Sequence, residues 1–384
     1  MGRVKQDALE HWERGLTSVP EKMVCHRHFT DYAIRDSIKA NVQAGKCSYC
    51  KKTGATELET LMFFMMEGVM NFYEDAAGFM RYDSNEGGYQ GEIFSQDELI
   101  NDEIGLDVDD NVLREDIINS IDDRAWATPN SYYDSQRDIL VYHWGYFKDV
   151  AKHKARYLFA QTTRLRSFDY QLNPYLILED IGRYISEFQM VSYLSKGAIL
   201  SRCRQHLAKD LVIEAKDISS PPLEKATMPS RMSPAGIPMF YCAFDKETAK
   251  AETIIENDLS KPKVTTCNFK VRKDLKVIDF GKLPKRISMF DTENFREYHV
   301  VQFLHEFVAD LSKGIKRDGK EHIEYVPTQI LTEYFRYMFP ETIHGIVYPS
   351  SKRKGSNSCV LFFDQNESIK HLHFQKQSLL TEDI

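Results

Sequence analysis

The chain has 384 residues, of which 42% are hydrophobic and 28% charged, and its formal net charge is −7 at pH 7. This length allows two or three domains that each bury a core, and the composition is that of a soluble globular protein. The net negative charge argues against a general nucleic-acid binder. No apolar run reaches the length of a membrane span and no secretory leader is present, so we expect a cytoplasmic protein.

Two residue pairs near the start of the chain have the spacing of a metal site. They are Cys25 with His28 and Cys47 with Cys50, each pair separated by two residues. Two such pairs supply the four nitrogen and sulfur ligands of tetrahedral zinc, and reduced cytosolic thiols favour a metal over a disulfide. No further donor or base stands beside them, so the pattern predicts a structural zinc. His26 competes with His28 as the ligand.

The region that follows has the periodicity of helices. We expect helices over residues 30–43, 55–82 and about 134–160, with helical signal to about residue 196. An acidic tract between Asp83 and Asp123 is interpreted as a solvated face, because its one calcium-loop candidate lacks the required turn glycine. The second of these helices carries apolar residues at core spacing, namely Leu58, Leu61, Met62, Met65, Met66 and Val69.

Beyond about residue 196 the residue types and their spacing change. Short runs rich in β-branched and aromatic residues predict strands over 263–271, 275–280, 345–348 and 359–363. Two helices are expected among them, over 293–313 and 327–338. The predicted fold class is therefore α+β, with a zinc-knuckle-like segment at 1–55, a mainly α-helical region at 56–195 and a catalytic domain at 196–384.

One stretch of this last domain gathers three chemically different side chains. Arg231 precedes a proline–glycine turn, and the apolar run 237–244 that follows predicts a buried strand containing Tyr241. Asp245 then occupies the N-cap position of a helix that carries Glu252. By spacing alone, these could equally be a surface cation, a core aromatic and a solvated helix residue.

This stretch and a second one downstream resemble the RES domain family. The likeness runs from about residue 198 to about residue 365, and several motifs occur in the family's order. The second stretch is a strand that ends at Ser350, followed by a small-residue turn and another apolar strand. The matching residues are Arg231, Pro234, Gly236, Tyr241, Glu252, Gly345, Ile346, Tyr348, Ser350, Gly355, Asn357 and Val360 to Phe363, flanked by Arg202, Arg204, Pro221, Pro222 and Tyr325 to Gln329.

The part before residue 196 resembles the N-terminal domain found joined to HEPN or RES domains. The two metal-type pairs, Trp144 to Phe147 and Lys152 to Tyr157 carry this likeness. That family commonly begins with two C-x-x-C pairs, whereas His28 replaces one cysteine here. The resemblance thus implies the zinc without assuring it.

The RES resemblance implies an ADP-ribosyltransferase-like fold and cleavage of NAD, which is consumed as a substrate and not held as a redox cofactor. Glu252 is expected to face the positive charge that develops on the ribose, and Tyr241 to stack on the nicotinamide. Arg231 is expected to hold the pyrophosphate. The same resemblance implies Ser350 as a ribose or phosphate donor, with Arg202, Arg204 and Ser351 as further substrate-binding candidates.

Three outcomes of this cleavage stay open. Inorganic phosphate as acceptor makes the protein an NAD phosphorylase, water makes it a glycohydrolase, and a protein side chain makes it an ADP-ribosyltransferase. RES domains are typically toxins restrained by an antitoxin, so a protein regulator or the N-terminal half is expected to restrain this one, in toxin–antitoxin or anti-phage defence. A homo-oligomer is compatible with the sequence.

Two other classes of function are also open. Arg137 and His143 have the spacing associated with ribonucleases of the HEPN class, where His acts as general acid or base and Arg holds the phosphate. Six residues exceed one helical turn, so the two side chains do not share a helix face without a bend. The last alternative is a non-catalytic interaction module.

Overall fold

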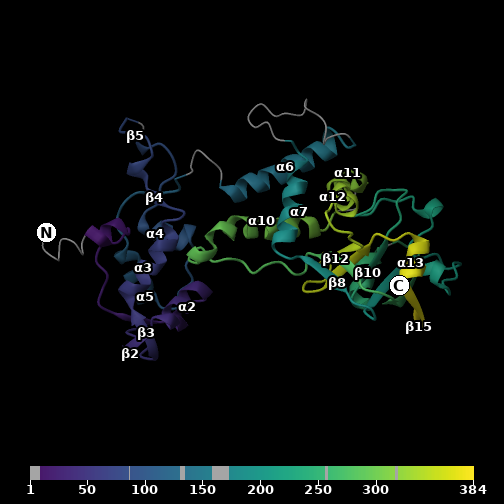
Figure 1. Cartoon of the computed structure of the whole chain (residues 1–384), viewed down its shortest axis with the longest axis horizontal. Coiled ribbons are helices and arrows are strands. Elements are labelled where there is room, and N and C mark those ends of the chain that lie inside the picture. Colours follow the sequence, from purple (N-terminus) through teal and green to yellow (C-terminus); the bar gives the residue numbers. More distant parts are fainter. Residues whose placement is uncertain (1–8, 86, 130–134, 158–172, 256–257, 316–318) are drawn as a thin grey trace. The chain divides into compact units, whose positions relative to one another are not determined.

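The structure is a computed structural model that describes residues 9–85, 87–129, 135–157, 173–255, 258–315 and 319–384. Its contacts divide the chain into two compact units (Figure 1). Unit 1 comprises residues 1–137 and 286–302, and unit 2 comprises residues 138–285 and 303–384. The chain therefore passes from one unit to the other three times. Unit 1 runs past the predicted boundary at 55, its first segment ends at 137 where the sequence predicted a boundary at 195, and residues 286–302 also pack within it.

Unit 1 is a small α+β assembly. An antiparallel sheet has the strand order β1-β3-β2, and the predicted helix within 30–43 is confirmed as α2. This helix begins at Tyr32 because the carboxylate of Asp31 accepts hydrogen bonds from the Ala33 and Ile34 amides. The main elements are β1 (Met23–Cys25), α2 (Tyr32–Ala40), β2 (Gln43–Lys46), β3 (Thr53–Glu57), α3 (Leu58–Val69) and α5 (Asn111–Ser120).

The apolar stripe predicted for the helix over 55–82 is confirmed, but the helix is shorter. It is α3, and all six of the predicted apolar residues are buried in the core of unit 1. Phe290, from the segment 286–302, belongs to the same core. A Cβ atom added to Gly68 of α3 would lie 2.8 Å from the Cα atom of Phe290, so glycine permits this close approach.

The acidic tract does more than face solvent. Asp110 caps α5 by accepting a hydrogen bond from the Leu113 amide. Asp116 accepts hydrogen bonds from Lys22 at 2.5 Å and from the Tyr49 hydroxyl at 2.7 Å. The interpretation of the tract as a solvated face is therefore wrong for these two residues.

The helices predicted for the middle and the end of the chain are present with adjusted bounds. The helix expected over 134–160 is α6; residues 134 and 158–160 lie outside the described residues. The helical signal toward 196 ends earlier, at Glu187, and a strand follows it. Among the described residues, no helix has both the length and the apolar character of a membrane span. The bounds are α6 (Gln136–His153), α7 (Leu176–Glu187), α10 (Phe295–Ser312) and α12 (Val326–Tyr337).

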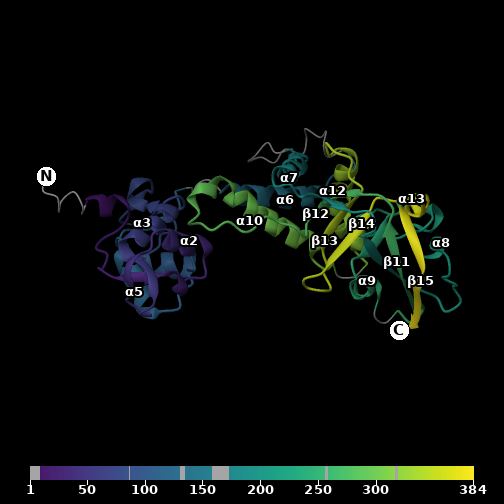
Figure 2. The same ribbon diagram turned by 60° about the horizontal axis from the view of Figure 1, so that its bottom comes forward.

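A large sheet organises unit 2. In the described residues it has eight strands in the order β15-β11-β9-β10-β14-β13-β12-β8, all paired antiparallel except β12 with β13. Figure 2 shows β15 beside β11 at one edge. The α+β class is thus confirmed. The strands are β8 (Val191–Leu194), β9 (Ile199–His206), β10 (Phe240–Ala243), β11 (Lys263–Val271), β12 (Leu275–Asp279), β13 (Gly345–Pro349), β14 (Asn357–Leu361) and β15 (Leu372–Asp383).

The strand register determines which side chains share a face of this sheet. Tyr241 on β10 pairs with Val360 on β14, and Val360 pairs with Ile346 on β13, so these three residues lie on one face. Alternation along β13 brings Tyr348 to the same face. The neighbouring residues Phe240, Cys242, Val347 and Leu361 belong to the core on the opposite face.

The helix that carries Glu252 packs on the Tyr241 face. This helix, α9 (Lys246–Thr253), begins at the predicted N-cap, where Asp245 accepts a hydrogen bond from the Thr248 amide. Its Ala249 packs in one cluster with Ala243, which lies two residues beyond Tyr241 on β10. The strand, the cap and the helix of the predicted unit therefore bring Tyr241 and Glu252 to one side of the sheet.

Candidate active site and metal site

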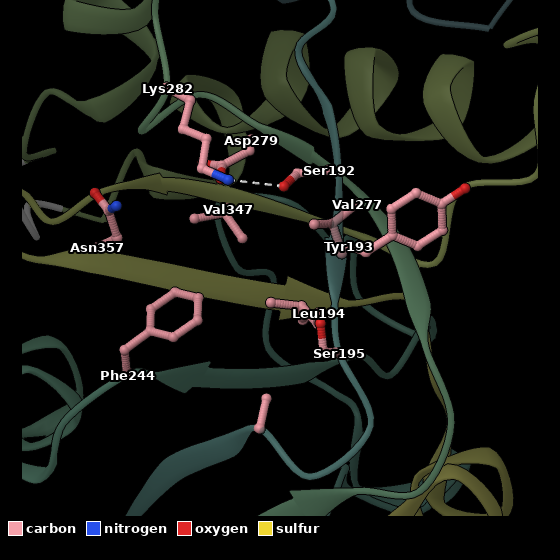
Figure 3. A pocket seen from close by; sticks show the side chains of 11 residues that line it. Ser192, Tyr193, Leu194, Ser195, Phe244, Val277, Asp279, Lys282, Val347 and Asn357 are labelled. Carbon is pink, nitrogen blue, oxygen red and sulfur yellow. Dashed lines mark hydrogen bonds and ion pairs between the residues drawn. The ribbon is translucent and has the colours of Figure 1, made fainter.

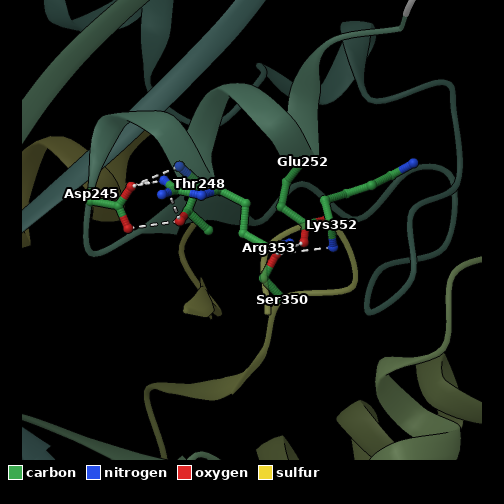
Figure 4. Close-up of polar contacts among 6 residues, drawn as sticks. All are labelled: Asp245, Thr248, Glu252, Ser350, Lys352 and Arg353. Carbon is green, nitrogen blue, oxygen red and sulfur yellow. Dashed lines mark hydrogen bonds and ion pairs between the residues drawn. The ribbon is translucent and has the colours of Figure 1, made fainter. Parts of the chain in front are cut away.

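Glu252 and Ser350, which are 98 residues apart in the chain, are joined by a hydrogen bond. The Ser350 hydroxyl donates to Oε1 of Glu252 at 2.5 Å, and the Ser351 backbone amide donates to the same oxygen at 3.1 Å. Figure 4 shows the carboxylate in the last turn of α9 pointing to the end of β13. The half-buried carboxylate is therefore held in one orientation, and Ser351 contributes its amide.

The turn after Ser350 is fastened to α9 at a second point. Arg353 Nη1 donates to Asp245 at 2.8 Å and lies 3.4 Å from the Thr248 hydroxyl (Figure 4). The Ser350 oxygen also accepts the amides of Lys352 at 3.2 Å and Arg353 at 3.1 Å. The turn is thus attached near both ends of α9, by Arg353 at its start and by Ser350 at its end.

Tyr241 supports the loop that carries Arg231. Its hydroxyl accepts the Met232 amide at 3.2 Å and lies 3.0 Å from the Ser233 hydroxyl. Burial raises the pKa of Tyr241 to about 12, so the phenol stays protonated at neutral pH. Helix α12 holds the same loop, because Thr328 donates to the Arg231 carbonyl and Gln329 donates to the Ser230 carbonyl at 2.9 Å.

The guanidinium of Arg231 has no carboxylate partner among the described residues. Its Nη1 donates to the Leu311 backbone carbonyl, and the side chain is half-buried. A positive charge that is partly desolvated and not neutralised by an acidic side chain favours an anion nearby. This arrangement is compatible with the predicted binding of a pyrophosphate.

Tyr348, a member of the strand motif that precedes Ser350, lies near the candidate site residues. It is 7% exposed and lies two residues before Ser350, on the Tyr241 face of the sheet. Burial raises the pKa of its hydroxyl well above the usual value; interactions with Tyr241 and Glu252 add to this shift, and the charge of Arg231 opposes it. Tyr348 therefore lies within electrostatic range of all three predicted side chains. Strand alternation counted back from Ser350 was the signal that could have found it.

Arg202 and Arg204, both predicted to bind substrate, are engaged with the backbone. Arg202 donates from Nε to the Ile218 carbonyl at 2.5 Å, from Nη2 to the Ser219 carbonyl at 3.1 Å and from Nη1 to the Tyr241 carbonyl. Arg204 donates to the Asp217 carbonyl. In this geometry both side chains tie β9 to the segments that follow it, and a phosphate would have to displace these hydrogen bonds.

A cavity of about 410 Å³ lies on the opposite face of the sheet (Figure 3). Val277 and Val347 line it, and Val347 is the strand neighbour of Tyr348, so the two side chains point to opposite faces. Two of the lining residues are joined by a hydrogen bond, in which Lys282 donates to the Ser192 hydroxyl at 2.9 Å. None of the predicted catalytic residues lines this cavity, so its volume gives no measure of the candidate active site.

The four predicted metal ligands of unit 1 come together. The donor atoms of Cys25, His28, Cys47 and Cys50 all lie within 4.8 Å of one another. The Cys25 and Cys50 sulfurs are 3.5 Å apart, and His28 Nε2 is 3.4 Å from the Cys47 sulfur. A tetrahedron with metal–sulfur bonds of about 2.3 Å has edges of about 3.8 Å, so the donor set fits a metal ion.

Asp109 selects the nitrogen that His28 offers to a metal. Its carboxylate lies 2.5 Å from His28 Nδ1, which leaves Nε2 directed at the cysteines. Burial lowers the pKa of His28, but the hydrogen bonds to Asp109 and the thiols outweigh it and raise that pKa to about 9. His26, the competing candidate, is not a member of the cluster.

Arg137 and His143 of the ribonuclease-type motif lie on one helix, α6. At 100° per residue, six residues place them about 240° apart around the helix axis. Burial lowers the pKa of His143, opposed by the charge of Asp180, whereas the charge of Arg137 acts on Tyr298. The two side chains therefore have different surroundings, and the ribonuclease alternative gains no support.

Comparison with protein families gives two matches along the chain. Residues 40–165 match the family model described as HEPN/RES N-terminal domain 1, and residues 200–379 match the model described as RES domain. The second match contains all seven predicted catalytic and substrate-binding residues. Neither the comparison with curated proteins nor the comparison with solved structures found a match.

Proposed function

Because this chain is a RES-domain protein with an HEPN/RES N-terminal domain ahead of the RES domain, we propose that it degrades NAD by breaking the nicotinamide–ribose bond. At the level of the family, these domains indicate a toxin-like, NAD-related function. The observation that carries the proposal is the Glu252 carboxylate, which Ser350 and Ser351 orient on the same face of the sheet as Tyr241.

Glu252 would stabilise the transition state. Cleavage of the bond to nicotinamide builds positive charge on the ribose, and a fixed carboxylate facing that charge interacts more strongly with the transition state than with bound NAD. Ser350 acts through Glu252, because its hydroxyl proton is directed at the carboxylate. We therefore assign Ser350 as a positioning residue and Glu252 as the catalytic residue.

Tyr241 and Arg231 would place the substrate. The phenol ring offers a surface on which the nicotinamide stacks, and Arg231, which lacks a carboxylate partner among the described residues, would hold the pyrophosphate. Basic residues of the turn after Ser350, among them Lys352 and Lys354, could receive inorganic phosphate. For this reason we favour phosphorolysis over hydrolysis and over transfer to a protein.

The metal of unit 1 is proposed to be zinc with a structural role. Three thiols and one imidazole, closely grouped, are a typical zinc donor set. Such an ion would hold together the segments that carry Cys25 and Cys47. We further propose that a protein antitoxin, or residues 1–137, restrain the NAD-degrading activity in the cell.

The test is to incubate the purified full chain with NAD, with and without inorganic phosphate, and to identify the products. Nicotinamide together with phosphorylated ADP-ribose identifies phosphorolysis, and nicotinamide with ADP-ribose identifies hydrolysis. We expect Glu252→Ala to lower kcat by about 10²- to 10³-fold and Arg231→Ala to raise KM. Absence of NAD turnover in the unaltered protein would refute the proposal.

A further inference from the structure

Tyr348 is a buried phenol near the candidate active site, and it has no part in the mechanism proposed so far. It is 7% exposed and lies on β13, which ends one residue before Ser350. The register of β10, β14 and β13 gives it the same face as Tyr241. Its phenol therefore lies on the side of the sheet where Glu252 and the Arg231 loop are found.

The hydroxyl of Tyr348 forms no hydrogen bond within the part of the chain that the structure describes. It is also not one of the unpaired polar atoms that are sealed from solvent, so its oxygen borders open space. A buried hydroxyl without a partner is costly, and native proteins normally supply one. An unpaired hydroxyl that borders open space is therefore available to a bound molecule.

The charges around this hydroxyl indicate which part of a ligand it meets. The charge of Glu252 raises the pKa of this phenol and the charge of Arg231 lowers it, so both side chains act on the hydroxyl. The Glu252 carboxylate accepts hydrogen bonds and suits the ribose hydroxyls. Arg231 is a donor without a carboxylate partner in the described residues. A second donor close to such a guanidinium matches an anion that accepts several hydrogen bonds.

We propose that the Tyr348 hydroxyl donates a hydrogen bond to a phosphate oxygen of the dinucleotide's diphosphate, beside Arg231. This inference rests on the proposed function and adds a residue to its substrate site. The high pKa of the phenol supports it, because the hydroxyl keeps its proton at neutral pH and remains a donor.

The test is Tyr348→Phe in the full chain, which removes the hydroxyl and keeps the ring. A hydrogen bond to a charged acceptor that is unchanged by the reaction contributes equally to the ground state and the transition state. We therefore expect KM for NAD to rise about 10- to 100-fold with kcat nearly unchanged. The melting temperature should stay that of the unaltered protein. The matched control is Tyr337→Phe, whose ring is 67% exposed, and it should leave all three values unchanged.

Binding of ADP-ribose, measured by calorimetry, gives a second readout because this compound contains the diphosphate and lacks nicotinamide. Its Kd should rise with Tyr348→Phe by a factor similar to that of KM. An unchanged KM and Kd would overturn the inference while leaving NAD cleavage standing. A fall in kcat alone would place the hydroxyl at the reacting ribose, and a lowered melting temperature would make it structural; both contradict the proposal. If the unaltered protein does not turn over NAD, the proposed function fails first and this inference falls with it.

Discussion

At the scale of single residues, the hydroxyl of Tyr241 has a task that stacking on nicotinamide does not require. From the sequence, Tyr241→Phe should lose little activity, because stacking needs only the ring. In the structure, however, the hydroxyl bonds to Met232 and Ser233 and so supports the loop that begins with Arg231. This tyrosine, which we propose as the stacking surface for nicotinamide, therefore also braces the neighbouring loop.

We predict that Tyr241→Phe raises KM for NAD by about 3- to 10-fold, because the loss of two neutral hydrogen bonds costs about 1–2 kcal/mol and loosens the Arg231 loop. The change should be seen in steady-state kinetics of nicotinamide release and as a lower melting temperature. Kinetics and melting temperature both equal to those of the unaltered protein would mean that the brace is not needed.

The sequence predicted residue types better than it predicted their partners. Glu252 and Ser350 were both named from motifs 98 residues apart, and the structure joins them by a hydrogen bond. Tyr348 was not assigned a role, because only the pairing of β13 with β14 and β10 shows which face it shares. Arg202 was predicted to bind substrate because of its place in a motif. The motif does not show that backbone carbonyls already accept hydrogen bonds from its guanidinium.

At the scale of elements, α9 and the turn after β13 are held together by contacts at both ends of the helix. Asp245 caps α9 and also accepts Arg353 from the turn, while Glu252 at the other end of α9 accepts Ser350. The ion pair between Arg353 and Asp245 is about half exposed, so its contribution to stability is small. We expect the ion pair to matter instead for the position of Ser350, which lies in the same turn as Arg353.

We predict that Arg353→Met and Asp245→Ser each lower kcat by about 3- to 10-fold through misplacement of the turn. Serine is itself a good N-cap, so Asp245→Ser should keep the melting temperature, whereas Asp245→Ala should cost about 1 kcal/mol as the cap is lost. The double variant should be no worse than either single variant, because both remove the same contact. Losses that multiply in the double variant would show that the two residues act separately.

The metal-type cluster depends on a residue from the acidic tract. Asp109 orients His28 through Nδ1, and residues in this position commonly tune metal affinity. We predict that Asp109→Asn weakens zinc binding by about 10- to 100-fold, measured by competition with a chromophoric chelator. Asp102→Asn, an exposed carboxylate in the same tract, is the matched control. Equal affinities in both variants would contradict the role of Asp109.

At the scale of the whole molecule, the compact units do not follow the order of the chain. The segment 286–302 falls inside the RES match, yet its Phe290 is buried in the core of unit 1 against α3. Patterns of periodicity describe one stretch at a time, so they could predict α3 and α10 but not this pairing. The α+β class followed from local signals, whereas the composition of the units depends on contacts between distant segments.

We predict that Gly68→Ala lowers the stability of unit 1 by about 1–3 kcal/mol, because the new methyl group would meet the backbone at Phe290 and Met289. If residues 1–137 restrain the enzyme through this segment, NAD turnover by the full chain should rise in the same variant. The control is Gly78→Ala in the same unit, where an added Cβ atom meets nothing within 4 Å. Lower stability with unchanged turnover would argue against restraint by this route.

The chain passes between its two units three times, and this affects whether a protease can release one unit from the other. A protease that cuts once, between residues 137 and 138, severs the covalent link but leaves residues 286–302 packed in the core of unit 1. The amino-terminal fragment would then stay bound to the rest of the protein without a peptide bond. A single nick therefore does not liberate the RES domain, and release by cleavage demands that the Phe290 segment be cut out or unfolded as well.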